Sequence, residues 1–141
     1  RSARTPPRGA RPPPRAAAPM PAPRAALLDP AVLYVCIPVH DEAATIGVLL
    51  WRIRTVFLEH ARDYEVVVYD DGSTDATPEV LEPYRKVLPL TVLRGERREG
   101  TAHAVDALCR HVVGVTRFPR RDGMVLMQGD FTDRPEDLVA L

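Results

Sequence analysis

The chain has 141 residues, of which 45% are hydrophobic, and its 19 basic and 19 acidic side chains give a formal net charge of zero at pH 7. No run of residues approaches the roughly 18 apolar positions that a membrane-spanning helix requires, and no signal-peptide core is recognisable, so neither feature is expected within these 141 residues. Cys36 and Cys109 lack the spacing of a metal site, and we expect both to be reduced thiols in a reducing compartment.

The neutral total conceals two unlike parts of the chain. Residues 1–28 contain six arginines, eight prolines and no acid, which leaves thirteen basic and nineteen acidic side chains for residues 29–141. Such a tract buries too little apolar surface to offset chain entropy, so we predict a disordered tail over residues 1–28. A basic tail can touch anionic lipid or nucleic acid, but an extension without a partner is the simpler interpretation, and no nucleic-acid ligand is expected.

Four short apolar runs predict buried strands. They are residues 32–37, which Pro38 stops, and then residues 65–69, 90–93 and 124–127. Continuous apolar runs of this length are typical of strands that are covered on both faces, as in a parallel sheet.

Two of the segments between these strands have clear helical spacing. Apolar residues recur with the helical period over residues 46–57, where we expect Trp51 to pack against the rest of the domain. A further helix is predicted over residues 101–113, with Val105, Leu108 and Val112 on its apolar face.

Two other helices are predicted from their first residues. Ser73, Thr74 and Asp75 are all plausible N-caps for a helix that runs to about residue 88, with Pro83 as a possible interruption, and Pro135 fits the start of a last helix. The alternation of strand and helix predicts an α/β fold with a mostly parallel, Rossmann-like sheet flanked by helices.

Polar residues gather after the first, second and fourth predicted strands, at residues 38–42, 70–73 and 128–132. Each cluster alone is compatible with ordinary turn chemistry. In a parallel sheet, however, the three clusters emerge at one edge, where open α/β sheets bind their ligands. Adjacent carboxylates at the end of the second strand could there bind a nucleotide's ribose or base, so a nucleotide site is predicted.

These clusters resemble the motifs of family 2 glycosyltransferases. Residues 38–42 are similar to the family's Pro-x-Tyr-Asn-Glu opening, and residues 70–75 match its second motif without a change. Residues 94–102 resemble the Gly-x-Gly-Thr-Ala loop of the dolichyl-phosphate mannose synthase branch, and residues 128–136 stand where that branch has its Asp-x-Asp motif. The resemblance covers about residues 32–141 and implies the GT-A nucleotide-sugar-binding fold.

The resemblance also implies site residues, carried over by position. Contacts to the nucleotide sugar would come from Pro38, His40, Glu42, Tyr69, Asp70, Asp71, Gly100, Thr101, Gln128, Gly129 and Asp130. Within this set, Asp71 would hold the base or ribose beside Tyr69, with Asp70 in support. A divalent cation, Mg²⁺ or Mn²⁺, would be held by Asp130, Gln128 and Thr132.

Three positions depart from the family pattern. His40 stands for the usual Tyr and Asp41 for the usual Asn, and both can still contact a nucleotide. Gln128 replaces the first carboxylate of the metal motif, and a neutral carbonyl oxygen is a weaker donor to a hard cation. Metal binding would then depend on Asp130, the diphosphate and water, with Thr132 or Asp133 as further donors.

The function implied by the resemblance is inverting transfer of a sugar from a UDP- or GDP-sugar to an acceptor, with a polyprenyl or dolichyl phosphate as the first choice. A saccharide or another lipid acceptor stays open, as does a non-catalytic nucleotide-sugar-binding protein. A dinucleotide-binding protein is disfavoured because no Gly-x-Gly-x-x-Gly follows the first strand. A lipid acceptor would place this cytoplasmic protein at the cytoplasmic face of a membrane as a peripheral protein.

The ends of the chain predict a fragment. The first residue is not methionine, and the last seven residues have only begun a helix. We therefore expect residues 29–141 to be the N-terminal, donor-binding part of a glycosyltransferase domain that is inactive alone. Its catalytic base is expected beyond Leu141.

Overall fold

The computed structural model describes residues 31–141, so the tail predicted over residues 1–28 lies outside the described residues. Four parallel strands, β1 (Leu33–Val39), β2 (Tyr64–Asp70), β3 (Leu90–Arg94) and β4 (Gly123–Leu126), form a sheet in the order β3-β2-β1-β4. The predicted α/β fold with a parallel sheet is confirmed.

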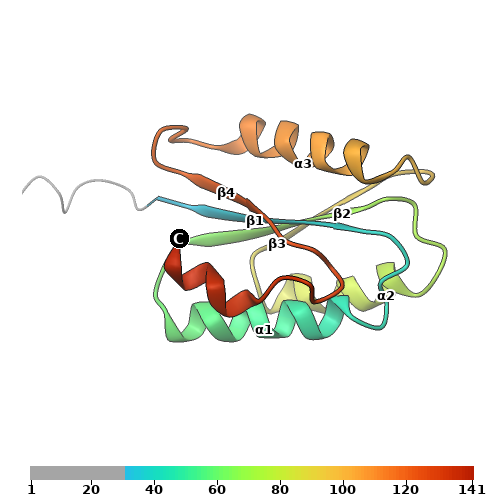
Figure 1. The fold of residues 1–141 in the computed structure, drawn as a ribbon, viewed down its shortest axis with the longest axis horizontal. Helices are drawn as coiled ribbons and strands as arrows, with labels where there is room; N and C mark the ends of the chain where they lie inside the picture. The colour runs from blue at the N-terminus through green and yellow to red at the C-terminus, as the bar shows by residue number, and fades with distance from the viewer. Residues whose placement is uncertain (1–30) are drawn as a thin grey trace, which may run out of the picture.

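Helices cover both faces of this sheet (Figure 1). The helices α1 (Ile46–Glu59) and α2 (Thr77–Leu81) and the 3-10 helices η2 (Glu82–Lys86) and η3 (Pro135–Ala140) lie on one face, and α3 (Thr101–Val115) lies on the other. The molecule therefore has three layers, with the strands buried between helices.

Alternate residues of β1 fill two separate cores, because successive side chains of a strand point to opposite faces. Val35 and Ile37 pack with α1, whereas Tyr34 and Cys36 pack with α3. Cys36 is fully buried, and this burial raises the pKa of its thiol to about 12. The side chain is therefore a neutral core thiol, as the sequence predicts.

The first strand continues through Pro38 to Val39, so the prediction that Pro38 stops it was wrong. The reason is that proline lacks an amide hydrogen only on the side of β1 that faces β4. Cys36 accepts the amide hydrogen of Met127, and Val39 accepts that of Asp71, so even-numbered residues of β1 face β4 and odd-numbered ones face β2. Strand β4 pairs with β1 only as far as Cys36, so Pro38 has no partner there that needs its donor.

Because β4 pairs with β1 only as far as Cys36, the two strands leave an opening at their carboxyl ends. Strands β1, β2 and β3 are added in one direction, and the chain then crosses over through α3 to place β4 on the other side of β1. Such a reversal of strand order is where open α/β sheets bind ligands. The topology therefore places any site beside Pro38.

The second predicted helix is interrupted. The α-helical part ends at Leu81, and the chain continues as the 3-10 helix η2. Pro83 explains the break, because proline has no amide hydrogen and its ring clashes with the carbonyl four residues earlier. The N-cap of α2 is Ala76, outside the set of three that we predicted, and the final helix that begins at Pro135 is a 3-10 helix.

One prediction about a buried face was wrong, and another was confirmed only in part. Trp51 is 55% exposed and lies under the guanidinium of Arg54, with 5.4 Å from the guanidinium carbon to the ring centroid, rather than in the core. On α3, Ala104 joins Leu108 and Val112 in the buried set, while Val105 is only half-buried.

Truncation of a core leucine on α1 should destabilise the fold far more than truncation of an exposed one. Leu50 is fully buried and Leu58 is 67% exposed on the same helix. We expect Leu50→Ala to lower the free energy of unfolding by about 2–5 kcal/mol and Leu58→Ala by less than about 0.5 kcal/mol. Urea denaturation measures both, and equal losses would contradict the core described above.

Candidate functional site

The three polar turns meet at one cleft at the carboxyl edge of the sheet, as predicted. The cleft has a volume of about 200 Å³ and is lined by Pro38, Val39, His40, Glu42, Asp71, Arg98, Gly100, Thr101, Ala104 and Gln128. Seven of the eleven residues predicted to bind the nucleotide sugar are among these lining residues. In the described part of the chain, Tyr69, Asp70, Gly129 and Asp130 belong to the surrounding structure instead.

Asp71 connects the second turn to the loop that precedes α3. Its Oδ1 accepts the amide hydrogen of Glu99 and its Oδ2 accepts that of Gly100, both at 2.8 Å. The whole residue is 4% exposed, and it lines the cleft. Asp71 therefore holds the wall of the cleft in place, and its predicted contact with base or ribose would use its remaining lone pairs.

Gly72 permits this close contact between the second turn and the loop. Its φ is +63°, and an added Cβ would lie 2.5 Å from the carbonyl carbon of Arg97 and 2.7 Å from the amide nitrogen of Arg98. Both the left-handed backbone and the lack of space favour glycine at this position. The loop can cover the turn only because residue 72 has no side chain.

Asp70 stabilises the turn from inside and is not among the described residues that line the cleft. It is 1% exposed, and its Oδ1 accepts the amide hydrogen of Ser73 at 2.9 Å. Its Oδ2 lies 3.6 Å from Nε of Arg94, whose guanidinium also donates to the carbonyl of Ser73. These contacts hold the turn that carries Asp71, and the supporting role of Asp70 in ligand binding stays a prediction.

The first and second turns are joined by side chains to which sequence reasoning assigned other roles. Oδ1 of Asp41 accepts the amide hydrogen of Thr74 at 2.8 Å, and Oδ2 of Asp75 accepts that of Ala43 at 3.1 Å. The amide of Asp41 in turn donates to the hydroxyl of Ser73. The exact match of residues 70–75 to the family motif was the available signal that these side chains are needed.

These carboxylates are held in their charged form. The amide hydrogen of Thr74 lowers the pKa of Asp41, and the hydroxyl of Thr77, 2.5 Å from Oδ1 of Asp75, lowers the pKa of Asp75. Asp41 adopts a φ of +54°, which short polar side chains tolerate best. The positions of both turns therefore depend on ionised aspartates.

His40 bridges the first two turns inside the cleft. Its Nδ1 lies 2.8 Å from the carbonyl oxygen of Asp71, and because a carbonyl only accepts, Nδ1 carries the hydrogen. Its Nε2 lies 3.3 Å from Oδ2 of Asp41. The ring is thus fixed by backbone and carboxylate, with an edge that still lines the cleft.

The remaining predicted residues support the cleft. Tyr69 is 7% exposed and packs edge-on against the ring of His103 on α3, with 5.9 Å between centroids. Glu42 lines the cleft and accepts the hydroxyl hydrogen of Thr45 at 2.7 Å. Gly129 lies against Val39, where an added Cβ would approach Cγ1 to 3.1 Å.

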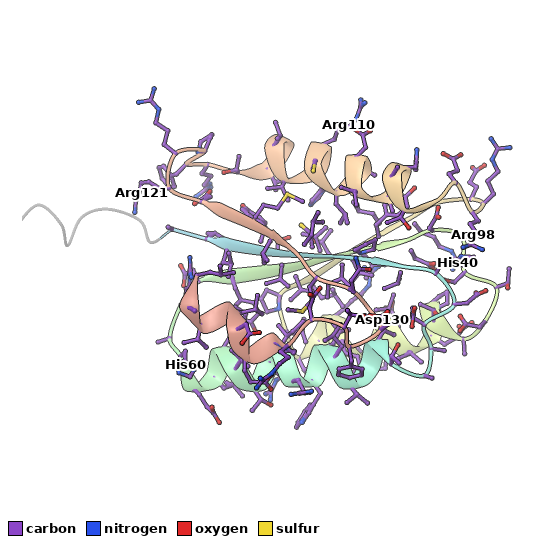
Figure 2. The ribbon with its side chains drawn as sticks, viewed as in Figure 1. His40, His60, Arg98, Arg110, Arg121 and Asp130 are labelled. Carbon is purple, nitrogen blue, oxygen red and sulfur yellow. The ribbon has the colours of Figure 1, made fainter. Side chains whose placement is uncertain are left out.

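The predicted metal ligands lie at the end of β4 and are only partly inside the cleft. Gln128 lines the cleft, whereas Asp130 is exposed and its Oδ1 accepts both the amide and the hydroxyl hydrogen of Thr132. The hydroxyl of Thr132 lowers the pKa of Asp130, and Oδ2 of Asp133 is occupied by the amide of Gln128. Figure 2 shows Asp130 set back from His40 and Arg98.

This donor set suits a hard cation only with help from a ligand. Residues 31–141 contain no group of three histidine, cysteine or acidic side chains that could hold a metal ion. Mg²⁺ and Mn²⁺ accept few carboxylates when water and phosphate oxygens supply the other bonds. One carboxylate at Asp130 and neutral oxygens from Gln128 and Thr132 therefore fit a cation that arrives with a diphosphate.

Comparison with known proteins shows the family. Residues 34–138 match the family described as glycosyl transferase family 2. The match covers most of the chain, so the chain belongs to this family, and the predicted resemblance is confirmed.

Two curated relatives are similar over about three quarters of the chain. A dodecaprenyl-phosphate galacturonate synthase from Rhizobium johnstonii is 27% identical over 111 residues, which cover 77% of this chain and 31% of the relative. An undecaprenyl-phosphate 4-deoxy-4-formamido-L-arabinose transferase from Pseudomonas aeruginosa is 30% identical over 113 residues, which cover 76% and 30%. The chain thus spans about three tenths of the length of these relatives.

Solved structures share the fold. A mannosyltransferase from Pyrobaculum calidifontis, in complex with GDP-Man and Mn²⁺, superposes with a TM-score of 0.50 at 33% identity, over 60% of this chain and 25% of that one. Mannosyl-3-phosphoglycerate synthase from Rubrobacter xylanophilus gives a TM-score of 0.57 at 19% identity, over 77% of this chain and 33% of that one.

Across residues 31–141, the helices are all too short or too polar to span a bilayer.

Introduction of a side chain at Gly72 should release the loop from the second turn. The Cβ of Gly72→Ala would clash with the backbone of residues 97 and 98, so the hydrogen bonds from the amides of Glu99 and Gly100 to Asp71 should weaken. We expect amide hydrogen exchange at residues 99 and 100, followed by NMR, to become at least about tenfold faster.

Gly114→Ala is the matched control, because an added Cβ there meets no atom within 4 Å and the residue lies in α3. It should leave exchange at residues 99 and 100 unchanged. Unaltered protection of these amides in Gly72→Ala would refute the close-packing argument.

Acid should loosen the junction of the first two turns. The folded-state pKa values of Asp41 and Asp75 lie below the ordinary 3.8, so their stabilisation is present above that pH and is lost as the pH falls through the folded-state values. We expect the melting temperature to fall below about pH 4, and Asp75→Asn to lower it at neutral pH and flatten this dependence. Circular dichroism melts at stepped pH measure the effect.

Asp106→Asn is the control for this series, because Asp106 pairs only with Arg110 on the exposed face of α3. It should keep the wild-type dependence on pH. An Asp75→Asn curve that runs parallel to the wild-type curve at every pH would show that Asp75 does not contribute.

Proposed function

We propose that this chain is the donor-binding part of an inverting glycosyltransferase that moves a sugar from a UDP- or GDP-sugar to a polyprenyl phosphate. The observation that carries the proposal is the convergence of three family motifs on one cleft at the strand-order reversal of a family 2 domain. Membership of the family and the composition of the cleft point to the same chemistry.

The donor class is supported by the character of the cleft and by one relative. The lining is rich in polar side chains and in backbone from the start of α3, which suits a nucleotide and its phosphates. The mannosyltransferase that shares 33% of its aligned residues was solved with GDP-Man and Mn²⁺. We therefore propose a nucleoside diphosphate sugar as the donor, with a Mn²⁺ or Mg²⁺ ion.

The acceptor class is supported by the curated relatives. The names of both relatives specify a polyprenyl phosphate, dodecaprenyl in one and undecaprenyl in the other. A polyprenyl phosphate is therefore the first choice of acceptor for the whole protein. Because such an acceptor is confined to a membrane, we propose peripheral association with the cytoplasmic face of a membrane.

Each wall of the cleft would contribute separately to donor binding. Asp71 and Gly100 would set the wall that contacts the nucleoside, and His40 would fix the opposite turn. Gln128, Asp130 and Thr132 would hold the cation, which when bound neutralises the charge of the departing diphosphate. We assign no catalytic base within residues 31–141.

A second candidate is a nucleotide-sugar-binding protein without transferase activity. It is favoured by Gln128, which puts a neutral amide where the family motif has a carboxylate, and by the position of Asp130 outside the cleft lining. The two candidates differ in their need for metal, because catalysis of this type requires neutralisation of the leaving diphosphate.

Calorimetric titration of the chain with UDP and GDP, with Mn²⁺ or with EDTA, tests the proposal. We expect Mn²⁺ to strengthen binding, Asp130→Ala to abolish that gain, and Asp71→Ala to weaken binding under both conditions. Tight binding that ignores metal would favour the second candidate. Equal losses from the two variants in EDTA would refute the division of roles, and preference for NAD over both nucleotides would refute the site.

A further inference from the structure

Arg98 is the one permanently cationic side chain among the described residues that line the cleft. It lies on the loop between β3 and α3, and Figure 2 places it beside His40 at the carboxyl edge of the sheet. The other charged groups of the lining are the carboxylates of Glu42 and Asp71. A diphosphate that enters this cleft therefore meets two carboxylates and one guanidinium.

The two nearest arginines, at the end of β3 and on the loop, already have acidic partners. Nε of Arg94 lies 3.6 Å from Asp70, and Nε of Arg97 lies 3.4 Å from Glu99. Arg98 forms no ion pair or hydrogen bond with any residue in the described range 31–141. A loop of mixed charge thus leaves one guanidinium unpaired, and that guanidinium faces the cleft.

The backbone that carries Arg98 is held firmly. Its amide nitrogen lies directly over Gly72, within 2.7 Å of where a Cβ would be, and the next two amides donate to the carboxylate of Asp71. A side chain on an anchored backbone loses less freedom when it binds than one on a mobile loop. Arg98 is therefore prepared to bind a ligand.

The metal motif at residues 128–132 leaves part of a diphosphate's charge for another cation, such as Arg98, to neutralise. Gln128 adds no negative charge to hold a divalent ion, and the carboxylate of Asp130 is outside the cleft lining and engaged with Thr132. With one carboxylate in place of two, the metal's contribution to neutralising a diphosphate is reduced. A guanidinium supplies charge and a bidentate pair of donors that match phosphate geometry.

We propose that Arg98 binds the diphosphate of the donor and supplies part of the charge neutralisation that the weakened metal motif lacks. This inference depends on the proposed function for the class of ligand. It predicts that the chain retains measurable affinity for nucleoside diphosphates without metal, and that this affinity depends on Arg98.

The test compares Arg98→Ala with Arg97→Ala in EDTA by calorimetry. Arg97 is the matched control, because it is the adjacent arginine and its side chain is 83% exposed and paired with Glu99. We expect Arg98→Ala to weaken binding of UDP and GDP by about tenfold or more, since charge-assisted hydrogen bonds are lost. Uridine and guanosine, which lack phosphate, should lose less than about twofold, and Arg97→Ala should change neither ligand class.

Arg98→Lys separates charge from geometry. A lysine keeps the charge but not the bidentate donors, so an intermediate loss of diphosphate affinity is expected. Protection of the amides of Glu99 and Gly100 in hydrogen exchange verifies that each variant keeps the loop in place.

The possible failures are distinguishable. Equal diphosphate affinities for Arg98→Ala and Arg97→Ala, in a wild-type chain that binds UDP or GDP, would overturn this inference and leave the proposed function standing. Equal losses for uridine and UDP in Arg98→Ala would also overturn it, because the role would then be structural. A wild-type chain that binds UDP or GDP with Mn²⁺ but not in EDTA would overturn this inference alone. A wild-type chain that binds neither nucleoside diphosphate, with Mn²⁺ or in EDTA, would overturn the proposed function and this inference together.

Discussion

The carboxylate of Asp71 accepts the amide hydrogens of Glu99 and Gly100, which lie 28 and 29 residues further along the chain. The shape of the cleft depends on this contact. It sets the start of α3 against the end of β2, and so determines where Gly100, Thr101 and Arg98 lie. The contact exists only because Gly72 leaves space for the loop backbone. Asp71, although it belongs to the predicted nucleotide-binding motif, therefore stabilises the protein's own loop.

The turn after β2 also forms hydrogen bonds with the turn after β1, which lies on the other side of the cleft. Ser73 and Asp75 accept amide hydrogens from the turn after β1, and His40 donates back to the carbonyl of Asp71. The turn after β2 therefore connects its two neighbours through aspartate carboxylates and short hydroxyl side chains. This explains physically why six consecutive residues match the family motif, although only Asp71 of the six lines the cleft.

The balance of charge in the cleft follows from two residues, Gln128 and Arg98. A neutral amide stands at position 128, and the arginine at position 98 has no ion-pair partner among residues 31–141. A diphosphate can be neutralised by a divalent cation, by a guanidinium or by both. The arrangement favours a shared role, in which the metal motif and the loop before α3 each contribute to donor binding.

The sequence by itself determined the layers, the order of strands and helices, and the edge where the polar turns meet, because buried parallel strands produce continuous apolar runs. It could not show that Pro38 remains in its strand, that Trp51 is exposed, or that Arg98 rather than Arg94 or Arg97 is the unpaired cation. The first depends on where β4 separates from β1, the second on which face of α1 packs against the sheet, and the third on which carboxylate folds beside which arginine. Only the tertiary structure decides these points, since β4 is distant in the chain from Pro38 and Asp70 is distant from Arg94.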